Sequence, residues 1–212
     1  GQPSTRRVHV KVCGLTCVDD AMACVELGVS AIGLNFVPAS PRCVRPEVAR
    51  LIVEAVGKRT LVVGVVANLP AHEARRLRDE VGLGCLQLHG DERPEELATL
   101  LPHAYKAIRV GGPSDVEMAA RMPGEYILVD AKVAGVLGGS GVRVEPALVA
   151  PLAKQRRLML AGGLTPENVA AAIEAVRPWA VDVASGVEGS LGPRRKDLAM
   201  VAAFLRAVAA VA

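Results

Sequence analysis

The chain has 212 residues and a formal net charge of +3. This positive excess is small and scattered, which gives no reason to expect a nucleic acid as partner. No apolar run reaches the roughly 18 residues of a membrane span, so we expect no membrane segment. Aromatic residues make up only 2%, so the core must be built from Val, Leu, Ile and Ala.

The cysteines indicate a reducing compartment. There are five, an odd number without regular spacing, which is not typical of a disulfide framework. Cys13 and Cys17 are followed by no second pair of ligands, so we expect no metal site. We therefore expect a cytoplasmic protein.

Two kinds of segment alternate along the chain: short apolar runs typical of strands, and longer runs with helical spacing. Several of the helix candidates open on Pro or on acids, as at Pro46-Glu47. The loops are short apart from a Gly-rich connector, so residues 1–212 are expected to form one domain. In chain order, the expected strands are residues 9–14, 31–36, 60–66, 85–90, 105–110, 126–131, 157–163 and 180–186.

A regular alternation of strands and helices fits either a closed barrel or an open doubly wound sheet. An open sheet has edge strands, and none of the expected strands is polar enough for an edge. The sequence therefore predicts a single-domain (β/α)8 TIM barrel. The chemistry of such a barrel lies where its strands end. The residues at these ends are Cys13, Asn35, His89, Arg109, Asp130, Gly162, Gly163, Ser185 and Gly186.

A phosphate site is predicted after the last two strands. Gly162 and Gly163 follow the seventh strand, and Ser185 and Gly186 follow the eighth. Glycine lets backbone N–H groups approach an anion, and these two loops frequently bind phosphate in barrels. The alternative is that the glycines only form tight turns.

A second Gly-rich segment, residues 135–141, follows the sixth strand and ends at Gly141. It lacks the lysine of a nucleotide-binding loop. We interpret it as a flap that closes over a substrate, the alternative being a surface loop.

Cys13 and Asp130 end the first and sixth strands, on either side of the predicted mouth. An apolar surrounding would favour the protonated form of Asp130, which suits a general acid. Side chains alternate along a strand, so Lys11 lies one layer below Cys13 and needs a partner, which we predict to be Asp182. This pair would lower the pKa of the Cys13 thiol. The alternatives are a core-filling thiol and a structurally paired carboxylate.

Four other polar side chains have two interpretations each. Arg42 lies in a Pro-stiffened loop after the second strand, where its guanidinium would bind a carboxylate or phosphate, or be solvated. The same ambiguity holds for Arg109. His89 and Asn35 either contact a substrate or stabilise the ends of their strands.

The ordered set of motifs resembles the phosphoribosylanthranilate isomerase family over nearly the whole chain. The resemblance implies an Amadori rearrangement of a phosphosugar in tryptophan biosynthesis, without metal or cofactor. We expect the chain to act as a monomer or homodimer. The resemblance also implies Cys13 as general base at sugar C2, Asp130 as general acid at the ring oxygen, and Arg42 as ligand of the anthranilate carboxylate. It places the phosphate on Gly141, Gly162, Gly163, Ser185 and Gly186. The matching segments are KVCGLT, GLNFVPASPR, VGVVAN, QLHGDE, VDA with GGSG, LAGGLTPENV and VDVASGVEGSLGPRRKD.

Two segments depart from the family pattern. Arg143-Val144-Glu145-Pro146 stands where an aromatic stretch is usual, which leaves the anchoring of the flap open. Ala184-Ser185 replaces the usual serine pair. Two other functions compete: a different phosphosugar isomerase or epimerase on the same barrel, for which an acid in place of Cys13 is expected, and a non-catalytic phosphate-binding subunit.

Overall fold

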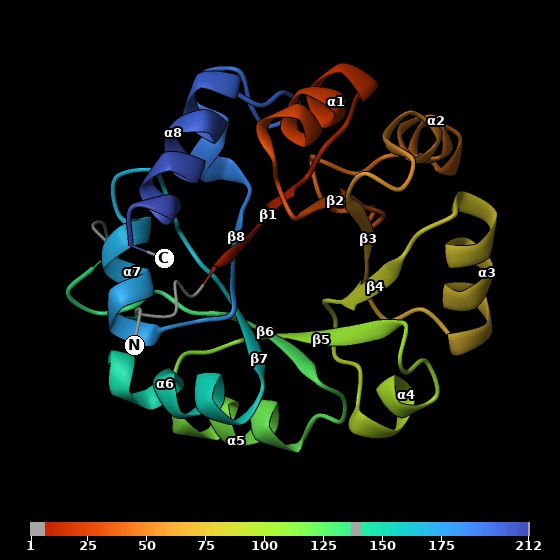
Figure 1. Cartoon of the computed structure of the whole chain (residues 1–212). Coiled ribbons are helices and arrows are strands. Elements are labelled where there is room, and N and C mark those ends of the chain that lie inside the picture. The colour runs from red at the N-terminus through yellow and green to blue at the C-terminus, as the bar shows by residue number, and fades with distance from the viewer. Residues whose placement is uncertain (1–6, 137–140, 212) are drawn as a thin grey trace, which may run out of the picture.

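The computed structural model describes residues 7–136 and 141–211. Within these residues the strands are all parallel and pair in chain order, and the last strand pairs with the first to close the barrel (Figure 1). The predicted (β/α)8 fold class is confirmed. The strands are β1 His9–Cys13, β2 Ala31–Asn35, β3 Leu61–Val66, β4 Cys85–Leu88, β5 Ala104–Arg109, β6 Tyr126–Asp130, β7 Arg157–Ala161 and β8 Ala180–Val183.

Helices surround the strands in an outer layer (Figure 1). Four of them carry Pro in the first turn, where the missing N–H costs nothing: Pro46, Pro94, Pro113 and Pro146. The first helix ends at Leu27 and is capped by Gly28, whose φ of +95° is left-handed. The helices are α1 Val18–Leu27, α2 Pro46–Val56, α3 Ala71–Val81, α4 Pro94–Ala98, α5 Pro113–Arg121, α6 Pro146–Gln155, α7 Val169–Val176, η1 Ser185–Val187 and α8 Leu198–Ala209.

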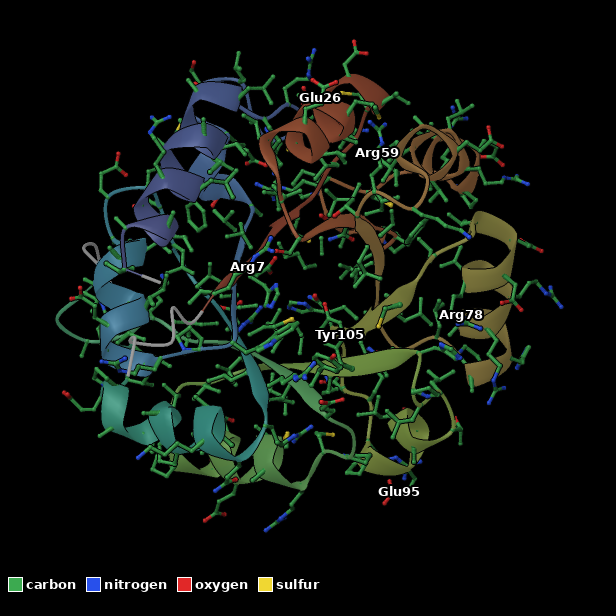
Figure 2. All side chains as sticks on the ribbon, in the orientation of Figure 1. Arg7, Glu26, Arg59, Arg78, Glu95 and Tyr105 are labelled. Carbon is green, nitrogen blue, oxygen red and sulfur yellow. The ribbon has the colours of Figure 1, made fainter. Side chains whose placement is uncertain are left out.

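The core has two layers, as alternation of side chains along the strands requires. An outer layer of aliphatic side chains fills the space between strands and helices. A smaller inner layer fills the barrel, and it includes Tyr105, Leu128 and Met159. Figure 2 shows Tyr105 inside the ring of strands, whereas Glu26 and Glu95 lie on the outer ring of helices. The barrel is therefore filled, and its open space lies at the strand ends.

The closure of the barrel brings together the ion pair predicted from the sequence. Lys11 on β1 is in register with Asp182 on β8, and Lys11 Nζ lies 3.0 Å from Asp182 Oδ1. Both side chains are nearly buried, with exposed fractions of 4% and 11%. The prediction of this pair is confirmed.

Strand ends are where the structure departs from the predicted boundaries. The sequence extends the seventh strand to residue 163, but β7 ends at Ala161 because Gly162 adopts a φ of +118°, outside the extended region. The eighth strand ends at Val183, and Ser185 begins the short helix η1. Among the described residues, no helix is long and apolar enough to cross a membrane.

Candidate active site

One cavity of about 480 Å³ lies at the carboxyl ends of the strands. Gly141 does not line it, and residues 137–140 of the predicted flap lie outside the described residues. The predicted site residues that line the cavity are Cys13, Asn35, Arg42, His89, Asp130, Gly162, Gly163, Ser185 and Gly186.

Cys13 is the last residue of β1, and its buried thiol packs against β2 at Gly33. A Cβ atom on Gly33 would lie only 2.5 Å from the Cys13 sulfur, so glycine makes room for the thiol. Burial raises the pKa of Cys13, and the neighbouring Lys11 ammonium opposes this shift only in part. Lys11 therefore acts on the thiol in the expected direction, but desolvation outweighs its attraction and the net shift of the pKa is upward.

A buried polar network supports the thiol from below. Lys11 Nζ donates to Gln87 Oε1 at 3.0 Å, in addition to its bond to Asp182. The Tyr105 hydroxyl donates to the same Gln87 oxygen at 2.7 Å. Burial lowers the pKa of Lys11, but Asp182 and the Cys13 sulfur together raise it by more. The net shift of the pKa is therefore upward, and Lys11 stays charged. The network fixes a positive charge beneath Cys13.

Asp130 ends β6 and lines the same cavity as Cys13. His89 is exposed at the mouth, where Gln87 Nε2 lies 3.0 Å from its Nδ1. Desolvation lowers the pKa of the His89 ring, an effect that the charge of Asp130 opposes. Arg109 is exposed and lines a neighbouring cavity instead.

The two predicted phosphate loops meet after β7 and β8. A Cβ atom on Gly162 would lie 2.7 Å from backbone of the segment after β6, and one on Gly186 would collide with the carbonyl oxygen of Leu164. Only glycine allows these loops to approach so closely. Asn168 Nδ2 donates to the carbonyl of Gly163 at 2.9 Å and shapes the first loop.

Arg42 lines the cavity, but one edge of its guanidinium is already paired with a carboxylate of the protein. Its Nε and Nη2 donate to the two carboxylate oxygens of Glu188 at 2.8 and 2.6 Å. The fork predicted to bind a substrate carboxylate thus already binds one from the protein. Asn35 also has a structural bond, since its Oδ1 accepts from the backbone N–H of Val37 at 2.8 Å.

Sequence reasoning missed several polar residues near the site. Glu188 and Lys196 are both buried, and Lys196 Nζ lies 2.8 Å from Glu188 Oε2. Lys132 and Gln87 line the cavity. A signal existed for Lys132, which follows the sixth strand by two residues, and for Gln87, an amide within an otherwise apolar strand. Among the residues that the structure describes, no cluster of three His, Cys, Asp or Glu is suited to hold a metal ion.

The chain matches known proteins in both sequence and fold. Residues 10–207 match the family described as N-(5'phosphoribosyl)anthranilate (PRA) isomerase. An N-(5'-phosphoribosyl)anthranilate isomerase of Pseudomonas aeruginosa (strain LESB58) is 45% identical over 203 residues, 95% of this chain and 95% of the relative.

Two solved structures are similar over nearly their full length. One is of monomers generated from a dimeric phosphoribosylanthranilate isomerase of Thermotoga maritima, with a TM-score of 0.81, 33% identity, and coverage of 95% of this chain and 98% of that one. The other is a phosphoribosyl anthranilate isomerase in complex with reduced 1-(o-carboxyphenylamino)-1-deoxyribulose 5-phosphate. It has a TM-score of 0.83 at 35% identity and covers 95% of this chain and 98% of that one.

Proposed function

The chain belongs to the N-(5'-phosphoribosyl)anthranilate isomerase family and is an aldose–ketose isomerase of tryptophan biosynthesis, and from this premise we propose which residues carry its reaction. Cys13 is the general base and Asp130 the general acid. The observation that supports these roles is that a thiol and a carboxyl, held on strands β1 and β6, line one cavity beside two glycine loops.

The proposed reaction needs two proton transfers on different parts of the sugar. Asp130 protonates the ring oxygen, so that the furanose opens and the C1–N bond becomes a protonated Schiff base. The thiolate of Cys13 then takes the proton from C2, and the electron pair moves to form a C1–C2 enolamine. Loss of the C2 hydroxyl proton and protonation of C1 complete the aminoketose. General acid–base catalysis of this kind contributes about 10²–10⁴-fold.

The remaining predicted residues bind the two anionic ends of the substrate. Backbone N–H groups of the loops at Gly162, Gly163, Ser185 and Gly186 hold the phosphate, because glycine permits close approach of an anion. Arg42 holds the anthranilate carboxylate. These contacts fix the sugar between base and acid, and such positioning supplies a large part of the rate. The contacts of His89, Asn35 and Gly141 with substrate, and the oligomeric state, monomer or homodimer, stay predictions.

Two isosteric or smaller substitutions test the catalytic roles. We expect Cys13→Ala and Asp130→Asn each to reduce kcat by about 10²–10⁴-fold, since each removes one proton transfer. Binding of the reduced product analogue should survive in both. Loss of the fluorescence of the anthranilate conjugate measures turnover, and fluorescence titration measures binding. A near-normal kcat in either variant would show that the assigned residue is not the base or the acid.

A further inference from the structure

The ion pair between Arg42 and Glu188 joins the loop after β2 to the loop after β8. Arg42 Nε and Nη2 donate to Glu188 at 2.8 and 2.6 Å, and the Glu188 side chain is only 5% exposed. The stem of Arg42 lies against the backbone of Gly14, where a Cβ atom would collide with it. The guanidinium is therefore fixed beside Cys13 before any substrate binds.

Glu188 uses only one edge of the guanidinium. A guanidinium has five N–H donors in a planar fork. The bonds to Glu188 use Nε and one hydrogen of Nη2, and no residue within the described ranges accepts from Nη1. Nη1 and the second hydrogen of Nη2 form another edge, which matches a second carboxylate with two parallel bonds. Arg42 lines the cavity, so the substrate carboxylate has access to it.

The charge of Glu188 is balanced by a second cation. Lys196 Nζ donates to Glu188 Oε2 at 2.8 Å, and its side chain is 1% exposed. Lys196 and Arg42 together carry two positive charges against the single negative charge of Glu188. One positive charge therefore remains for the substrate. Without Lys196, a second carboxylate would meet a neutral pair and gain little.

The same residues also contact the loop assigned to the phosphate. Lys196 Nζ donates to the carbonyl of Ala184 at 3.2 Å. The backbone N–H of Glu188 donates to the carbonyl of Ser185 at 3.1 Å. The position of Arg42 relative to the phosphate loop is therefore set through Glu188.

We propose that Glu188, neutralised by Lys196, is a positioning residue that holds Arg42 so that its outer edge selects a substrate with an aromatic carboxylate. This inference rests on the proposed role of Arg42. It explains how an arginine already paired with an acid still binds an acid in the substrate. It also gives the chain a preference between ligands that differ only in the carboxylate.

The test compares two reduced aminoketose phosphates, one with an o-carboxyphenyl group and one with a plain phenyl group. The Kd of the phenyl ligand divided by the Kd of the o-carboxyphenyl ligand measures the preference for the carboxylate. We expect Glu188→Gln to reduce this ratio by about tenfold or more, the effect of losing a charge-assisted hydrogen bond, because the amide cannot accept two bonds from the fork. With substrate, KM should rise while kcat changes less.

Two variants separate this inference from its premise. Arg42→Gln should abolish the preference, and if it does not, the proposed role of Arg42 itself is wrong. Glu92→Gln is the matched control, since Glu92 is another buried acid paired with a lysine, 3.2 Å from Lys106 Nζ. Its ratio should equal that of the unaltered protein.

The outcome is decisive in each case. If Arg42→Gln abolishes the preference but Glu188→Gln leaves the ratio unchanged or raises it, the positioning role is overturned. If Glu188→Gln does not fold, Glu188→Asp keeps the charge but shortens the reach to the fork. A reduced ratio in Glu188→Asp supports the inference, and an unchanged ratio overturns it.

Discussion

Removal of the buried ammonium beneath Cys13 should change both stability and the pH dependence of turnover. In Lys11→Met, the Asp182 carboxylate, whose side chain is only 11% exposed, loses the ammonium that lies 3.0 Å away. Gln87 loses a hydrogen-bond donor. Breaking such a buried pair costs about 3–5 kcal/mol. For a chain of this size each kcal/mol lowers Tm by about 2–4 °C, so we expect a decrease of about 6–20 °C.

The same substitution should shift the titration of Cys13, the proposed general base. Burial already raises the pKa of Cys13, and Lys11 is the main group that opposes this shift. Without the ammonium the pKa rises further, because a thiolate beside Asp182 is less favourable. The acidic limb of kcat/KM against pH, which reports ionisation of the free enzyme, should therefore move to higher pH. The fluorescence assay measures this limb.

Two further variants separate the electrostatic effect from general destabilisation. Lys106→Met removes another lysine that is 4% exposed and paired with a buried acid. The stability of this variant should therefore fall, but the acidic limb of its kcat/KM profile should not shift. Lys11→Met combined with Asp182→Asn should recover part of the stability, since no buried charge is left unpaired. If Lys11→Met leaves the acidic limb in place or moves it to lower pH, the argument about the thiol is refuted.

Two other predictions concern the loops after β7 and β8. In Gly186→Ala the added Cβ forces the loop away from the Leu164 carbonyl, so KM should rise about tenfold or more through weaker phosphate binding. Gly112→Ala, where a Cβ meets nothing within 4 Å, should match the unaltered protein. Equal KM values in the two variants would contradict the phosphate assignment. Burial raises the pKa of Glu188, but hydrogen bonds led by that from Arg42 lower it more, so the net shift is downward. The stabilising contribution of Glu188 is therefore present above the ordinary glutamate pKa of about 4.3 and is lost as pH falls through the lower pKa of the folded state. Below this pH, the free energy of urea unfolding should depend less on pH in Glu188→Gln than in the unaltered protein. An identical pH dependence in the two proteins would contradict the downward shift.

The barrel and the lining of the site follow from local patterns in the sequence. Each strand ends in a polar residue or is followed within two residues by a polar residue or glycine, and parallel strands in one barrel bring those ends to one face. This rule placed Cys13, His89 and Asp130 at one cavity. It also gave the pair of Lys11 and Asp182, because closure puts β8 beside β1 and alternation fixes which side chains face inward.

The rest depends on contacts that no local pattern encodes. Glu188 and Arg42 are 146 positions apart in sequence, and no local pattern in either segment predicts that they pair. Lys196 lies in a basic run that is solvated in most proteins, yet its side chain is buried here. The lowering effect of Lys11 on the pKa of Cys13 could be predicted, but the net upward shift could not, because it depends on how completely the thiol is desolvated.

The proposed mechanism requires base and acid to reach different atoms of one sugar held in one cavity. The most direct measurement is a crystal structure of this chain with the reduced product analogue. We predict that Cys13 Sγ lies about 3–3.5 Å from sugar C2, and that an oxygen of Asp130 lies within about 3.2 Å of the C4 hydroxyl, the former ring oxygen. An analogue bound with C2 turned away from Cys13, or with Asp130 out of reach of that hydroxyl, would contradict the account.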